Sequence, residues 1–300
     1  MMLLKFLWGL IVDDITINSY NELIDQIERI SSKPILAFDK ELRRYFFRGH
    51  ADKEWNLIPN ILRTPNAQEN KELIEIFNDV GNKKSKIALA VAQHYGRKTR
   101  CLDFTRNYKT ALYFACNPDD SAYNEDGAIF ILESSYHRPE WFTNYLVYYT
   151  ATDSRNDVSS WEYANYIIQQ NEIKKEFERT GRSFEIGDVN CAIQMYLSKG
   201  FMVDFENNDY NFERIKKQEA ALYYFGSKYY CIDDNNKKVY ADVDYISTHW
   251  SSQNRFWIEL HNLSNPNLEN KIYTTKIIIP QRLKKEIFER INIKASDLGL

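Results

Sequence analysis

The chain has 300 residues, which is enough for one large domain or two small ones. Its hydrophobic content of 44% and charged content of 27% are ordinary for a globular protein. The net charge of −3 excludes a global positive field that would attract nucleic acid, so any such contact has to come from a local patch.

The four cysteines and residues 1–12 indicate the cellular compartment of the protein. Cys101, Cys116, Cys191 and Cys231 are widely spaced and form no C-x-x-C pair, so they predict no zinc site. Without a secretory signal they indicate reduced thiols in a cytoplasmic protein. Residues 1–12 are apolar but shorter than the about 20 residues that a membrane span needs, so we expect a packing segment and no membrane contact.

The first half of the chain alternates strand and helix patterns. We expect a strand over 15–17, a helix capped by Ser19 and Glu22, and a strand from Tyr45 to Arg48 that Gly49 ends. Gly96 is a natural cap for the helix before it, and Thr105 for the helix after it. The expected helices cover 70–80, 86–95 and 106–116, with a buried strand over 127–133.

The second half is helical and polar over 136–200 and then mixes helix and strand patterns over 212–261. A strand over 271–279 and a helix over 283–291 close the chain. This order favours an α+β fold. The chain has only 10 glycines and no glycine-rich phosphate loop, so the Rossmann and P-loop folds lack their fingerprints.

Two segments place polar and charged residues inside apolar sequence, namely residues 45–50 and 93–105. A buried charge is costly unless it has a partner or a ligand. The two segments therefore predict one polar pocket.

The same segments resemble the FRG domain family. Phe47-Arg48-Gly49 matches the motif that names the family, and the stretches 92–105 and 111–115 match its second block. Arg214 with Gln218, and residues 276–280, are similar to its later blocks. The resemblance implies an FRG domain over 40–295, with an N-terminal helical extension over 1–39 and a mostly helical insertion near 136–200.

The family occurs in bacterial anti-phage defence and in toxin–antitoxin systems. A more distant resemblance is to ADP-ribosyltransferase toxins, in which a strand ending in Arg-Gly begins the NAD site. It implies a split mixed β-sheet core with flanking helices. Phe47-Arg48-Gly49, Tyr113-Phe114-Ala115 and Glu219 match the parts of that site.

This resemblance implies NAD as a substrate, and no metal is predicted. Breaking the bond between ribose and nicotinamide needs a cation for the pyrophosphate, a surface for the ring and a carboxylate near the ribose. The candidate catalytic residues are Arg48, Asp103 and Glu219. The candidate NAD-binding residues are Arg48, Gly49, His94, Tyr95, Thr99, Arg100, Thr105 and Tyr113.

Structural roles remain open for several of these residues. Arg48 and Asp103 could form a buried ion pair, and His94 and Thr105 could only cap their helices. Asp103 is expected to point away from Leu102 and Phe104 across a strand. Glu219 follows two lysines and a glutamine and could be a solvated surface group.

The leading hypothesis is a toxin-like ADP-ribosyltransferase that modifies a macromolecule. RNA is the preferred acceptor, protein remains open, and an antitoxin protein is the expected partner. The alternative is a non-catalytic module of a defence system that senses nucleic acid or another ligand. A metal-dependent nuclease is least supported, because no tight Asp/Glu/His cluster has metal-ligand spacing.

Overall fold

The computed structural model describes residues 14–32, 43–64, 69–80, 85–135, 140–181, 185–205, 213–241, 256–263 and 274–300. The apolar segment 1–12 and parts of the expected 212–261 and 271–279 elements lie outside these ranges. In the described part of the chain, no helix is long and apolar enough to cross a membrane.

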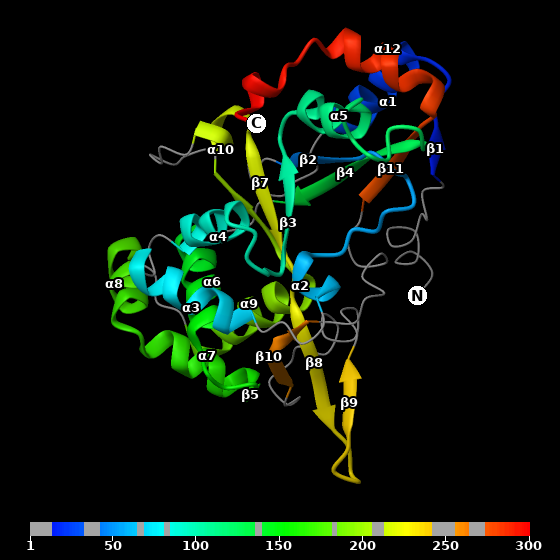
Figure 1. The fold of residues 1–300 in the computed structure, drawn as a ribbon. Helices are drawn as coiled ribbons and strands as arrows, with labels where there is room; N and C mark the ends of the chain where they lie inside the picture. Colours follow the sequence, from blue (N-terminus) through cyan, green and yellow to red (C-terminus); the bar gives the residue numbers. More distant parts are fainter. Residues whose placement is uncertain are drawn as a thin grey trace.

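The core of the fold is a mixed sheet of seven described strands in the order β1-β11-β4-β2-β3-β7-β6 (Figure 1). Its strands are β1 (Ile15–Thr16), β2 (Arg43–His50), β3 (Cys101–Thr105), β4 (Gly127–Ser135), β6 (Phe201–Asp204), β7 (Ala220–Tyr224) and β11 (Thr274–Ile279). The β1–β11 pairing is parallel, whereas the other pairings of this sheet are antiparallel. The expected α+β class with a mixed sheet is therefore confirmed.

A second sheet of four described strands has the order β5-β10-β8-β9. It consists of β5 (Asp157–Ser159), β8 (Ser227–Ile232), β9 (Lys238–Ala241) and β10 (Trp257–Leu263), all paired antiparallel. In Figure 1 the β8–β9 hairpin extends away from the rest of the chain.

One face of the large sheet packs against α1 (Tyr20–Ser31), α5 (Tyr108–Cys116) and α12 (Gln281–Ile291). The hydroxyl of Ser19 accepts a hydrogen bond from the Glu22 amide at 3.2 Å, as the sequence predicts. The Glu22 carboxylate accepts from the Asn18 amide instead of the Ser19 amide. Residues 1–39, expected as an N-terminal helical extension, include β1, which is a strand of the large sheet.

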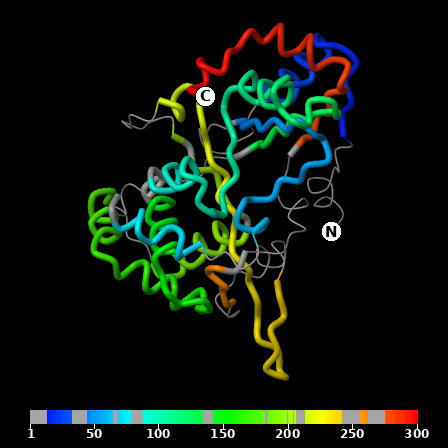
Figure 2. The backbone as a smooth tube through the Cα atoms, viewed as in Figure 1, coloured from blue at the N-terminus to red at the C-terminus, as the bar shows by residue number. Residues whose placement is uncertain are grey.

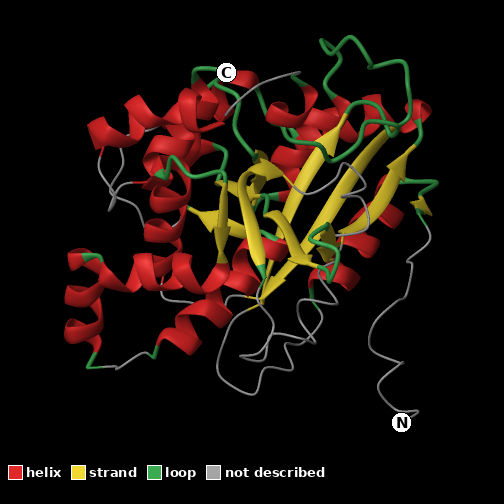
Figure 3. Cartoon of the chain, turned by 90° about the horizontal axis from the view of Figure 1, so that it is seen from below, coloured by secondary structure: helices red, strands yellow, loops and turns green. Residues whose placement is uncertain are grey.

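A helical lobe packs against the end of the large sheet formed by β3, β7 and β6, and Figure 3 shows its helices beside the strands. The remaining helices are α2 (Asn60–Arg63), α3 (Glu69–Val80), α4 (Ser85–His94), α6 (Glu140–Thr152), α7 (Ser160–Gln169), α8 (Asn171–Thr180), α9 (Ile186–Lys199), α10 (Glu213–Lys217) and the 3-10 turn η3 (Ala295–Leu298). The largest apolar cluster joins this lobe to both sheets. Helices α6 to α9 occupy most of the segment expected to be a helical insertion.

The end of the chain folds back onto α10, as Figure 2 shows. The Lys217 ammonium donates to the Ser296 carbonyl at 3.1 Å, and the Gln218 amide donates to the Leu298 carbonyl at 3.1 Å. A Cβ at Gly299 would meet the Arg214 Cα at 3.2 Å. The C-terminal turn therefore holds α10 in place.

Gly49 does not end its strand, contrary to the sequence prediction, because β2 continues to His50. A Cβ at Gly49 would lie 1.8 Å from the Ala111 carbonyl oxygen. The glycine is required because α5 crosses β2 at close range at this point. Gly96, by contrast, has the positive φ of +68° that a helix cap needs, as expected.

Candidate functional site

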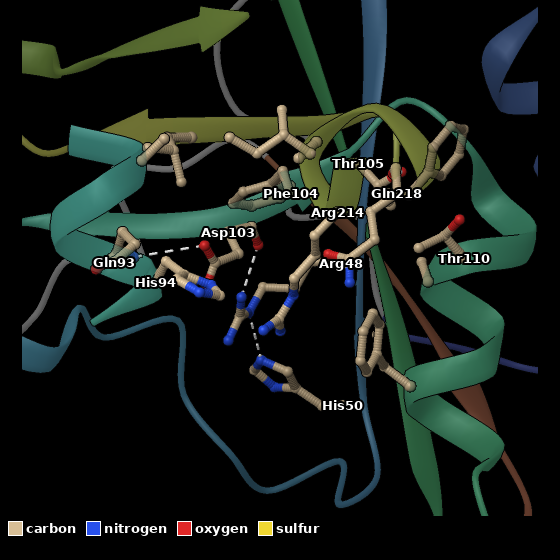
Figure 4. Close-up of a pocket in the computed structure, with 18 of the residues that line it drawn as sticks. Arg48, His50, Gln93, His94, Asp103, Phe104, Thr105, Thr110, Arg214 and Gln218 are labelled. Carbon is tan, nitrogen blue, oxygen red and sulfur yellow. Dashed lines mark hydrogen bonds between the residues drawn. The ribbon is translucent and has the colours of Figure 1, made fainter. Parts of the chain in front are cut away.

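A cavity of about 370 Å³ opens beside the middle of the large sheet (Figure 4). Residues of β2, β3, β7, α4, α5 and α10 line it. The cavity therefore joins the two polar segments from which the sequence predicted a pocket. Its volume lies in the range of small-molecule sites, which is about 300 to 1,000 Å³.

Arg48 projects from β2 into this cavity. Its Nε donates to Nε2 of His50 at 2.8 Å, and its Nη1 donates to the Asp103 main-chain carbonyl at 2.6 Å. Burial lowers the pKa of Arg48, which the nearby Asp103 charge opposes. Within the described ranges its guanidinium forms no salt bridge, so the Arg48–Asp103 contact is not the carboxylate ion pair considered from the sequence.

His50, two residues after Arg48 in β2, is buried, with 3% of its surface exposed. Its Nδ1 lies 3.0 Å from the Trp55 carbonyl, which can only accept, so this contact assigns the proton to Nδ1 and leaves Nε2 to accept from Arg48. Burial and the neighbouring Arg48 charge lower the pKa of His50 to about 3. His50 is thus a neutral acceptor for Arg48 at ordinary pH.

Asp103 lies at the centre of β3, with an exposed side chain between the buried Leu102 and Phe104. It points away from those two residues, as expected from strand alternation. Its carboxylate lines the cavity and lies 3.5 Å from the Gln93 amide nitrogen. The Gln93 amide oxygen in turn accepts from the Thr99 hydroxyl at 2.6 Å. An arginine and a carboxylate therefore face the same cavity.

Three other predicted site residues, namely Gly49, His94 and Thr105, also line the cavity. The Thr105 hydroxyl donates to the Gln218 carbonyl at 2.6 Å and accepts from the Asn107 amide. Thr105 is not the helix cap that the sequence predicted, because α5 begins at Tyr108 and Asn107 caps it.

Five predicted site residues lie outside the cavity lining, namely Tyr95, Thr99, Arg100, Tyr113 and Glu219. Tyr95 is 72% exposed and Thr99 is buried. Tyr113 is buried among α5 and α12, where its ring lies 5.5 Å from that of Phe288.

Arg100 is fully buried and serves as a junction between distant elements. Its guanidinium pairs with Glu69, donates to the Ser227 hydroxyl at 3.0 Å and donates to the Leu260 carbonyl at 2.7 Å. The Cζ atom of Arg100 lies 5.1 Å from the centre of the Tyr224 ring. These contacts satisfy the charge within the protein and leave it no opening to a ligand in the cavity.

Glu219 occupies the turn between α10 and β7 with a φ of +46°. Its carboxylate accepts from the Asn107 side-chain amide at 2.9 Å, and its carbonyl accepts from the Arg106 amide at 3.0 Å. Both contacts bind the turn to the beginning of α5. Asp103 is therefore the predicted carboxylate that faces the cavity.

Many residues that line the cavity have no site role in the sequence prediction, among them Trp55, Arg63, Arg214 and Gln218. Arg214 and Gln218 had a recognisable signal, because they resemble the family's later arginine–glutamine block. Trp55 and Arg63 carry no comparable pattern. Trp55 is 43% exposed, which is unusual for so large an aromatic side chain and fits a rim on which a flat ring could stack.

The described residues hold no group of three histidine, cysteine, aspartate or glutamate side chains that could bind a metal ion.

Comparison with known families gives a match to the FRG domain over residues 43–124. The later arginine–glutamine block, Arg214 with Gln218, lies outside the matched residues. The match confirms the resemblance of the first two blocks, although it is shorter than the 40–295 expected from the sequence. Comparisons with curated proteins and with solved structures found no match.

Proposed function

We propose that this chain, which contains an FRG domain over residues 43–124, is an ADP-ribosyltransferase that uses NAD as its substrate. The observation that carries the proposal is the pairing of Arg48 and Asp103 in one cavity. The first supplies N–H groups for a phosphate, and the second supplies a carboxylate for the ribose and the acceptor.

The binding part of the proposal rests on charge and shape. A guanidinium can hold a phosphate with two parallel hydrogen bonds, and Arg48 has no internal salt bridge among the residues described. Trp55, Phe104 and Phe114 give the cavity aromatic walls against which adenine or nicotinamide could pack. We also propose that the sheet around Arg48 corresponds to the split core of ADP-ribosyltransferases.

The chemical step breaks the bond between ribose C1′ and the nicotinamide nitrogen, and the electron pair leaves with nicotinamide. The acceptor then bonds to C1′ and loses its proton. Asp103 is the proposed base for that proton and the proposed stabiliser of the positive charge on the sugar. His50 does not fit this role, because its pKa of about 3 and its bond to Arg48 make it a poor proton acceptor.

The acceptor is proposed to be a macromolecule, with RNA preferred over protein, in a cytoplasmic toxin of a defence or toxin–antitoxin system. The FRG family match supports this setting by analogy alone. A toxin of this kind needs an antitoxin protein as its partner.

The test is incubation with NAD labelled in the adenosine part and with total cellular RNA and protein. Wild type is expected to transfer label to one fraction and to release nicotinamide, whereas Arg48→Ala and Asp103→Asn lose both. Glu219→Gln is expected to retain transfer, because Glu219 lies outside the cavity lining. Arg290→Ala is the matched control, since Arg290 is an exposed arginine of α12 paired with Glu286.

A non-catalytic binding module is the second candidate, because the lining holds three arginines, namely Arg48, Arg63 and Arg214, but few carboxylates. Folded wild-type protein that binds NAD or RNA, yet transfers no label and releases no nicotinamide, would favour this candidate over the enzyme.

A further inference from the structure

Arg48 is one of three arginines that line the cavity. Arg63 ends α2, and Arg214 lies in α10, so the three arise from segments far apart in the sequence. Figure 4 shows the side chains of Arg48 and Arg214 directed into the cavity. The close approach of Gly299 to Arg214 and two hydrogen bonds fix α10 against the C-terminal turn. These contacts hold the main chain of Arg214 in place.

None of the three guanidiniums has a salt bridge within the part of the chain that the structure describes. Arg63 donates one hydrogen bond, of 3.4 Å, to the Asn56 carbonyl. This contrasts with Arg100, whose charge is fully matched inside the protein. The cavity therefore has an excess of positive charge, because three arginines line it against two carboxylates, those of Asp103 and Asp120.

The charges of Arg48 and Arg63 also act on each other. The Arg63 charge contributes to lowering the pKa of Arg48, and Arg48 and Arg63 both contribute to lowering that of His50. Like charges held together in a partly desolvated cavity repel one another, and a bound anion relieves this cost. His50 cannot relieve this cost, because it is neutral and its Nδ1–H donates a hydrogen bond to the Trp55 main-chain carbonyl.

We propose that Arg48, Arg63 and Arg214 form a single phosphoryl-binding subsite, in which His50 is a positioning residue that fixes the orientation of Arg48. The inference rests on the proposed function in one respect: it assigns the pyrophosphate of NAD as the occupant. A phosphodiester of RNA has the same chemistry, so the experiment has an arm for each source.

The test is calorimetric titration of folded protein with inorganic pyrophosphate, ADP-ribose and a short single-stranded RNA. Loss of one charged hydrogen-bonding group is expected to weaken binding of pyrophosphate and ADP-ribose by about tenfold to hundredfold in each of Arg48→Ala, Arg63→Ala and Arg214→Ala. Binding is expected to fall with added salt in wild type and less steeply in the variants. Arg290→Ala is expected to bind as wild type does. Arg63→Gln and Arg214→Gln provide second variants if an alanine variant does not fold.

The role of His50 has its own pair of variants. Glutamine can accept from Arg48 with its oxygen and donate to Trp55 with its nitrogen, whereas leucine can do neither. His50→Gln is therefore expected to bind ADP-ribose within a few-fold of wild type. His50→Leu, shown to be folded by circular dichroism, is expected to lose as much affinity as Arg48→Ala. Equal affinities for the two variants would contradict the positioning role.

The outcomes separate this inference from the proposed function. Unchanged pyrophosphate binding in the Arg63 and Arg214 variants overturns the subsite, even if label transfer from NAD is observed. If pyrophosphate binding depends on the three arginines but no label is transferred from NAD, the subsite is supported and the proposed transferase activity is contradicted. If the arginine variants bind RNA more weakly than wild type does but bind ADP-ribose equally well, NAD is not the occupant of the subsite.

Discussion

The Nε of Arg48 donates a hydrogen bond of 2.8 Å to Nε2 of His50, two residues further along β2. Residues two apart in a strand project to the same face, so the strand itself brings the two side chains together. The bond needs an unprotonated Nε2. It therefore connects the orientation of the cavity arginine to the charge state of a buried histidine.

The first prediction concerns acid stability. The pKa of His50 is about 3 in the folded chain, against an ordinary value of about 6.5. Below pH 6.5 the unfolded chain takes up a proton that the folded chain does not, so the stability due to neutral His50 is lost as pH falls from about 6.5 to 3. His50→Gln is expected to remove up to about 1.4 kcal/mol per pH unit from that slope.

The measurement is the free energy of unfolding by urea at several pH values for wild type and His50→Gln. His261 is the comparison, because burial also lowers its pKa and His261→Gln should therefore flatten the same region. Parallel curves for wild type and His50→Gln would show that His50 is not held neutral.

The second prediction concerns the glycine of the FRG motif. A Cβ at Gly49 would overlap the Ala111 carbonyl, so Gly49→Ala must push α5 away from β2. We expect a loss of about 3 kcal/mol or more in unfolding free energy, since neither partner is a flexible side-chain end. Gly187→Ala is the control, because a Cβ there meets nothing within 4 Å. Thermal unfolding of the two variants distinguishes a packing requirement from a ligand requirement.

The third prediction separates Arg100 from the cavity. Removing one partner of the buried Arg100–Glu69 pair leaves an uncompensated charge, which costs about 3 to 5 kcal/mol. Arg100→Met is therefore expected to lower the unfolding free energy by this amount, while the fraction that remains folded binds ADP-ribose normally. Arg179→Ala, which breaks an exposed pair with Glu176, is expected to change stability by less than about 1 kcal/mol. Weaker binding by folded Arg100→Met would restore Arg100 to the candidate site.

The fourth prediction concerns Lys284, a fully buried lysine of α12. Its ammonium donates to the carbonyls of Ala51, Ala122 and Tyr123 at 2.6, 3.3 and 3.2 Å. Lys284→Met leaves these carbonyls without their donor and is expected to cost at least about 2 kcal/mol of unfolding free energy. The exposed neighbour serves as the reference, and Lys285→Met should unfold as wild type does in the same urea titration.

Local patterns predicted much of the fold. Ser19 and Gly96 cap helices as expected, because capping depends on a few neighbouring residues. Gly49 was misread as the end of a strand, since its role depends on Ala111 in a helix that lies far along the chain. Thr105 was misread as a cap because its hydroxyl has a distant partner, the Gln218 carbonyl.

The candidate site was predictable only where a motif carried it. Arg48 and Asp103 face the cavity because each projects from a strand of the large sheet. Arg100 also lies in a motif block, yet it forms a buried salt bridge with Glu69 and does not line the cavity. No local sequence pattern indicates Glu69 as its partner. Arg63 is the reverse case. It belongs to no motif, yet it lines the cavity from the four-residue helix α2.

The parallel pairing of β1 with β11 has a consequence for synthesis of the chain. Ile15 lies opposite Ile277, and β11 is also the strand that separates β1 from β4. On the ribosome, β1 leaves the exit tunnel early but has no strand to join until β11 follows, and the β4 edge stays open for the same interval. An exposed edge is prone to wrong pairing, so this interval is the time at which the nascent chain is most exposed to aggregation.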